Sequence, residues 1–129
     1  MKVKIIVLLT CLTAWATNSL AQTYIPKFRS DLPKCVGEKQ NAWTLCVGTF
    51  KFPNGNIYTG EWHNGMREGN GELRIVAKGK STENYIGSEV PAVYTGEFMN
   101  NKLNGRGRLV LDTGEVVEGD FVNNIFTKR

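Results

Sequence analysis

The sequence is poor in the residues on which many enzymes and metal sites depend. Its 129 residues include one histidine and three cysteines. A catalytic cysteine normally needs a paired histidine, and a structural zinc ion takes four ligands. The single histidine, His63, falls in a predicted turn, and no Ser/His/Asp set or phosphate-binding glycine loop is present. We therefore expect no enzyme activity, no cofactor and no metal site.

Long apolar runs are also scarce. The one clear run spans residues 5–16, about a dozen positions, which is too short to cross the roughly 30 Å hydrocarbon layer as a helix. A basic head precedes it and the small residues Ser19 and Ala21 follow it, a pattern typical of a secretory signal peptide. We expect a signal helix in residues 1–21, cleavage before Gln22 and export, to the periplasm or outside a bacterium. Cys11 within the run loosely resembles a lipoprotein box, which leaves lipidation as an alternative.

An excess of charge is missing as well. The formal net charge is +4, and loss of Lys2 and Lys4 with the signal peptide would halve it. Such a weak surplus argues against a protein that binds nucleic acid by neutralising phosphates. All 14 glycines lie after residue 21, which disfavours long helices. The remaining length suits one domain.

Two cysteines remain after export. In an oxidising compartment Cys35 and Cys46 predict one disulfide across a short loop. Residues 22–45, with Pro26 and Pro33, are expected to form an extended N-terminal arm and disulfide cap ahead of a β domain at 46–129.

The second half of the chain repeats itself. Residues 58–73 align without gaps to residues 94–109, a degenerate third copy begins at 117, and residues 46–57 match the back half of the unit. Turn signals such as Asn64-Gly65 and Asn100-Asn101 separate short alternating runs, as in successive β-hairpins. An insertion at about 77–92 separates the two full copies.

The repeated motif, Tyr-x-Gly-Glu-Trp/Phe followed by Gly-x-Gly, resembles the MORN (membrane occupation and recognition nexus) repeat over residues 46 to about 124. Asn101 in place of the turn glycine, Val117 in place of the first tyrosine, and the insertion depart from the motif. The resemblance implies a mostly non-catalytic scaffold that mediates protein association, dimerises, or approaches membranes and anionic lipids.

A two-residue turn at Asn64-Gly65 predicts that Gly60 faces Gly69 and Tyr58 faces Gly71. The second copy predicts the same arrangement, with Gly96 facing Gly105 and Tyr94 facing Gly107. Aromatic rings would then lie flat on glycine backbone. The expected fold is all-β, an elongated antiparallel meander of successive hairpins.

The candidate binding residues are the repeated aromatic side chains on one face of this sheet: Tyr58, Trp62, Tyr94, Phe98 and Phe121. They form either a small core or an apolar groove for a peptide, a partner protein or a lipid. The insertion at 78–91 is either a contact loop or a tolerated extension.

The expected function is that of an exported, non-catalytic interaction module that binds protein or cell-envelope components. A small envelope-glycan hydrolase, using Glu61 and Glu97, or an inhibitor of one is the alternative. The last strand, around Phe121, is expected to be an open edge that allows a homodimer. An arginine cluster, interleaved with acidic residues, is a weak candidate for anionic lipid: Arg67, Arg74, Arg106 and Arg108.

Overall fold

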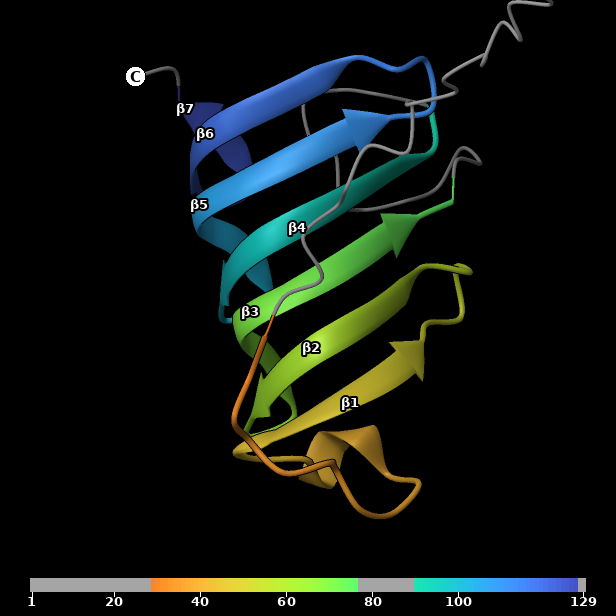
Figure 1. The fold of residues 1–129 in the computed structure, drawn as a ribbon. Coiled ribbons are helices and arrows are strands. Elements are labelled where there is room, and N and C mark those ends of the chain that lie inside the picture. The colour runs from red at the N-terminus through yellow and green to blue at the C-terminus, as the bar shows by residue number, and fades with distance from the viewer. Residues whose placement is uncertain (1–28, 77–89, 128–129) are drawn as a thin grey trace, which may run out of the picture.

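The computed structural model describes residues 29–76 and 90–127, which form one seven-stranded antiparallel sheet in chain order (Figure 1). The strands are β1 (Cys46–Lys51), β2 (Ile57–His63), β3 (Met66–Ile75), β4 (Ala92–Met99), β5 (Lys102–Leu111), β6 (Val116–Val122) and β7 (Ile125–Thr127). The predicted all-β meander is confirmed. The predicted signal peptide and residues 77–89 of the insertion lie outside the described residues. Within the described ranges, no helix is long and apolar enough to span a membrane.

Three tight turns join strands at one side of the sheet. Asn64-Gly65, Asn100-Asn101 and Asn123-Asn124 all have positive φ at both positions, between 48° and 71°. This is the conformation of a type I′ turn, which matches the right-handed twist of the strands that it connects. Asparagine tolerates positive φ better than other non-glycine residues, which explains the composition of these turns.

The predicted strand register is correct next to these turns and wrong beyond them. Trp62 pairs with Arg67 as predicted, but Gly60 pairs with Gly71 and not with Gly69. The second hairpin shows the same shift: Gly96 pairs with Gly107 rather than Gly105, and Tyr94 with Leu109 rather than Gly107. Tyr58 likewise faces Leu73.

A β-bulge causes the shift. Gly69 and Gly105 have φ of +84° and +106°, values that interrupt a regular strand and that glycine adopts without strain. Each bulge moves the register by two residues, so the side chains keep the same face of the sheet. The error therefore left the predicted faces intact.

The segment before β1 covers the first end of the sheet (Figure 1). Val47 of β1 donates to the Pro33 carbonyl and accepts from the Cys35 amide, both at 2.8 Å. The predicted Cys35–Cys46 disulfide is present. The 3-10 helix η1 (Gln40–Ala42) lies inside the disulfide loop.

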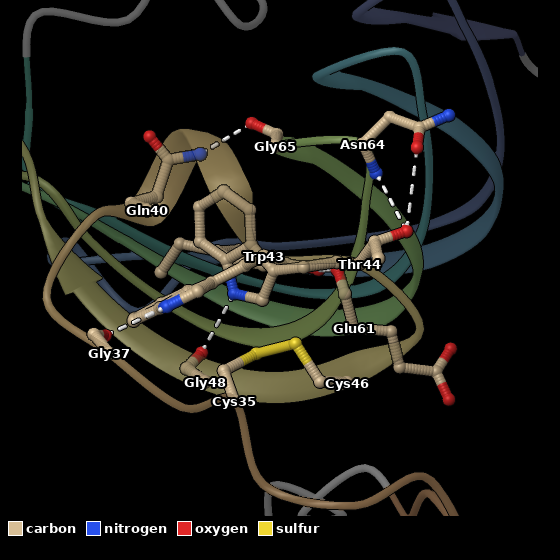
Figure 2. The surroundings of a disulfide bond; sticks show 12 residues. Cys35, Gly37, Gln40, Trp43, Thr44, Cys46, Gly48, Glu61, Asn64 and Gly65 are labelled. Atoms are coloured by element: carbon tan, nitrogen blue, oxygen red, sulfur yellow. Dashed lines mark hydrogen bonds between the residues drawn. A yellow bond between two sulfur atoms is a disulfide. The ribbon is translucent and has the colours of Figure 1, made fainter.

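Figure 2 shows how this cap is held against β1 and the turn between β2 and β3. Trp43 points its indole nitrogen at the Gly37 carbonyl, at 3.0 Å, and its ring packs edge-on against Trp62 at 5.4 Å between centroids. Gln40 donates to the Gly65 carbonyl of the first turn. The cap thus packs on β1 and on the turn that follows β2.

Candidate functional site

The repeated aromatic side chains form one continuous row of rings. Neighbouring rings meet edge-on, with centroids 4.9 to 5.2 Å apart, in the order Trp62, Tyr58, Phe98, Tyr94 and Phe121. This geometry is favourable for aromatic pairs, because the positive edge of one ring meets the negative face of the next. The structure therefore brings all of the predicted binding residues together.

These rings are not an open groove. Their exposed fractions lie between 0 and 3%, so the row is the hydrophobic core of the sheet. Of the two alternatives that the sequence left open, the core describes their position. The physical reason is that adjacent repeats place each ring against the next, which leaves little ring surface for a ligand.

The tyrosines lie on glycine backbone, as predicted. A Cβ at Gly60 or Gly71 would collide with the Tyr58 ring, and one at Gly96 or Gly107 would collide with Tyr94. Both hydroxyls also donate to a carbonyl three residues ahead: Tyr58 to Glu61 at 2.9 Å and Tyr94 to Glu97 at 3.1 Å. Burial raises the pKa of both tyrosines well above the ordinary value. These hydroxyls act as structural donors.

In the third repeat, a phenylalanine covers the glycine that a tyrosine covers in the first two repeats. Val117 stands where a tyrosine is expected, and the Phe126 ring from β7 covers the corresponding glycine: a Cβ at Gly119 would lie 3.0 Å from it. Phe126 also meets Phe121, with centroids 5.4 Å apart. The row of rings therefore continues past Phe121 and ends at Phe126. The strand that carries Phe121 is not the open edge that the sequence predicted, because β7 pairs with it.

The repeated glutamates hold the bulges. Glu61 accepts from the Asn70 amide at 2.6 Å, and Glu97 accepts from the Arg106 amide at 2.5 Å. Ser30 of the N-terminal arm donates to the other Glu61 oxygen. A Cβ at Gly69 or Gly105 would collide with these carboxylates. Both glutamates therefore repeat because every bulge leaves a backbone amide that needs an acceptor.

In the second and third tight turns, the second residue binds the preceding repeat. The amides of Asn101 and Asn124 donate to the carbonyls of Arg67 and Leu103, at 3.1 and 3.0 Å. Their side-chain Oδ1 atoms accept from the amides of those same two residues, each at 2.8 Å. One asparagine thus engages both backbone groups of one residue, an arrangement that we call the asparagine clasp.

Gly65 keeps half of the asparagine clasp. Its amide donates to the Trp43 carbonyl at 2.8 Å, but a Cβ there would lie 2.6 Å from the Asn41 carbonyl oxygen. The cap thus forces glycine into the first turn, whereas the later turns use asparagine. In the sequence, Asn101 stood out only as a departure from the turn glycine. The recurrence of asparagine at the same turn position, Asn124, was the signal that could have indicated the asparagine clasp.

The four arginines do not form one basic patch. Arg67 is buried, with its guanidinium carbon 5.3 Å from the Phe52 ring centroid and 5.8 Å from that of Phe98. Arg74 and Arg108 each lie beside an acidic side chain, Glu72 and Glu118, at 3.6 and 3.5 Å. Such pairing weakens the attraction of this face for an anionic surface.

A shallow hollow of about 320 Å³ lies on the side of the insertion, where β3 and β5 end and β4 begins. Its lining is mainly aliphatic and includes Arg74 and Asp112. Among residues 29–76 and 90–127, no group of three or more His, Cys, Asp or Glu side chains is placed to hold a metal ion.

The sequence matches known proteins through its repeats. The MORN repeat family matches residues 47–57, 58–76 and 94–116. Alsin from rat (Rattus norvegicus) and Alsin from human (Homo sapiens) are each 35% identical to this chain over 78 residues, which is 60% of its length. The chain spans about 4% of the length of these relatives. With its hairpins, paired glycines and repeated motif, the chain belongs to the MORN repeat family.

Proposed function

We propose that the chain is an exported, non-catalytic module that binds a protein or another cell-envelope component. The observation that carries this proposal is the use of Glu61 and Glu97. Each carboxylate accepts a hydrogen bond from a bulge amide, which is a structural task repeated with the motif. The pair therefore gives no support to glycoside hydrolysis, which needs one acid and one base or nucleophile with separated pKa values.

The surface that supports binding lies at the β6–β7 end. Val122 and Ile125 face each other across these strands, with exposed fractions of 49% and 66%. They form an apolar pair beside a sheet edge, and exposed apolar side chains at an edge favour contact with another chain. This site replaces the buried aromatic row as the candidate interface.

A protein partner fits this end better than an anionic lipid surface does. The interface pair is apolar, and Arg74 and Arg108 each lie beside a glutamate. Membership of the MORN family is consistent with protein association. Export rests on the sequence pattern of residues 1–21.

Cross-linking capture from an envelope extract tests the proposal. We expect a discrete partner that Ile125→Lys releases, because a charge would have to be buried at the contact. Val36→Lys is the matched control, since Val36 is 90% exposed at the opposite, capped end. Glu61→Gln and Glu97→Gln should leave capture unchanged. A glycan-cleaving activity that either glutamate variant abolishes would overturn the proposal. The mass of the secreted chain, expected to begin at Gln22, tests export separately.

A further inference from the structure

Among the described residues, one position at the end of the sheet lacks the asparagine clasp that the equivalent positions of the other repeats have. In each repeat the residue that is engaged lies two positions after the second turn residue: Arg67 follows Gly65, and Leu103 follows Asn101. The same spacing after Asn124 selects Phe126 in β7.

The amide and carbonyl of Phe126 point toward the outer edge of β7, away from β6. Ile125 pairs with Val122 directly beside the two-residue turn, so its amide and carbonyl point toward β6. Backbone groups alternate in direction along a strand, so those of Phe126 point outward. Nothing in the described part of the chain pairs with this outer edge of β7. Phe126 therefore presents its backbone groups as Arg67 and Leu103 do, and no described residue binds them.

The two ends of the sheet differ. At the β1 end, the Trp43 carbonyl already accepts the Gly65 amide, and the cap occupies the side of β1 at Val47. The asparagines of the later turns are engaged within the chain. Among the described residues, a second copy therefore has no free asparagine at the second position of a tight turn with which to engage Phe126, and the partner that fits is a different chain.

We propose that the outer edge of β7 binds a β-hairpin of another protein whose turn carries asparagine at its second position. This inference rests on the proposed binding function and specifies its partner. The incoming asparagine would engage the amide and carbonyl of Phe126 as Asn124 engages those of Leu103. An aromatic residue three positions before that asparagine, as Phe98 stands before Asn101, would meet the exposed side of the Phe126 ring.

A cyclised peptide with the sequence of residues 92–111 is a suitable probe, because this hairpin makes the same contact with Arg67 inside the chain. We expect it to bind the full chain and to slow hydrogen exchange of the Phe126 amide at least tenfold. The peptide with Asn101→Ala should bind about fivefold more weakly, the loss of one hydrogen bond. Equal binding of the two peptides, or protection that appears at β1 instead, would overturn the inference.

Two protein variants separate backbone recognition from folding. Phe126→Leu keeps the amide and removes the ring, so the Asn101→Ala peptide should still bind about fivefold more weakly than the original peptide. Phe126→Pro removes the amide donor and should lose binding. If the proline variant fails to fold, the peptide pair and Phe126→Leu still decide the question. Concentration-dependent dimerisation of the free chain that Phe126→Pro abolishes would assign the edge to a second copy and overturn the inference. Envelope capture that responds to Ile125→Lys while the peptide does not bind would leave the proposed function standing.

Discussion

The Tyr58 ring occupies the space that a side chain at Gly71 would need: a Cβ there would lie 2.6 Å from the ring atom Cζ. Tyr94 and Gly107 stand in the same relationship one repeat later. Ring and glycine are thus one structural unit, formed across a strand pair and repeated along the sheet.

Gly71→Ala should destabilise the fold by about 3 kcal/mol, because the added methyl displaces the Tyr58 ring from a packed row. Urea unfolding at neutral pH measures this. Glu72→Ala is the control: its side chain lies on the opposite face of the same strand and should change stability by less than about 0.5 kcal/mol. Equal effects of the two substitutions would show that the ring does not rest on Gly71.

Alkaline pH should destabilise the protein through its buried tyrosines. Burial raises the pKa of Tyr58 and Tyr94 in the folded state, so above about pH 10 the unfolded chain loses these protons first. Stability is complete below that pH and falls as the pH rises further. The double variant Tyr58→Phe, Tyr94→Phe should show a flatter decline between about pH 10 and 12. A decline that is identical in the variant would contradict the burial of these hydroxyls.

Glu97→Ala should cost about 1 to 2 kcal/mol, because the Arg106 amide in the bulge loses its acceptor. Glu97→Gln retains an acceptor oxygen and should cost clearly less. Denaturant unfolding gives both values, and hydrogen exchange at Arg106 locates the effect. A loss as large for glutamine as for alanine would mean that charge, and not acceptance of this hydrogen bond, explains the repeated glutamate.

Exchanging the second residue of the Asn64-Gly65 turn with that of the Asn100-Asn101 turn should destabilise the protein in both cases, but for different reasons. Gly65→Asn should destabilise by about 2 kcal/mol, because the new side chain would collide with the cap at Asn41. Asn101→Gly should also destabilise, by about 1 kcal/mol, because it removes the Oδ1 acceptor of the Arg67 amide. Thermal unfolding compares the two. A Gly65→Asn variant more stable than the original chain would show that the cap does not lie against this turn.

Reduction of the disulfide should loosen the capped end. Cys35→Ser with Cys46→Ser should lower stability by about 3 kcal/mol, the effect expected for a loop of this length. Unfolding with and without a phosphine reductant measures it. The original chain should respond to the reductant and the double serine variant should not.

The sequence was sufficient for the fold because two gapless copies of one motif restrict it strongly. Alternation placed Tyr58 and Trp62 on one face, and the Asn-Gly pair identified the turn. The register failed at Gly69 because a bulge is not visible in a turn-based count. A signal of the bulge was present in the repetition of Glu61, whose carboxylate accepts the hydrogen bond of the Asn70 amide in the bulge.

The candidate site was harder to predict than the fold. Sequence identifies which aromatic residues share a face, but not whether neighbouring repeats cover them, because that depends on ring packing between strands far apart in the chain. Phe126 shows the difficulty: it lies outside the motif, yet it replaces the missing tyrosine of the third repeat. The edge that remains available could be found only once β7 was seen to pair with β6.

The stacking of tyrosine on paired glycines is tested most directly by the proton NMR shifts of the Gly71 and Gly107 Hα atoms. If the rings lie on this backbone, these resonances are moved upfield by ring currents, and Tyr58→Leu and Tyr94→Leu each return only the resonance of the matching glycine to its ordinary position. Glycine Hα shifts at ordinary values, with no nuclear Overhauser contact to a tyrosine ring, would contradict the structure at its core.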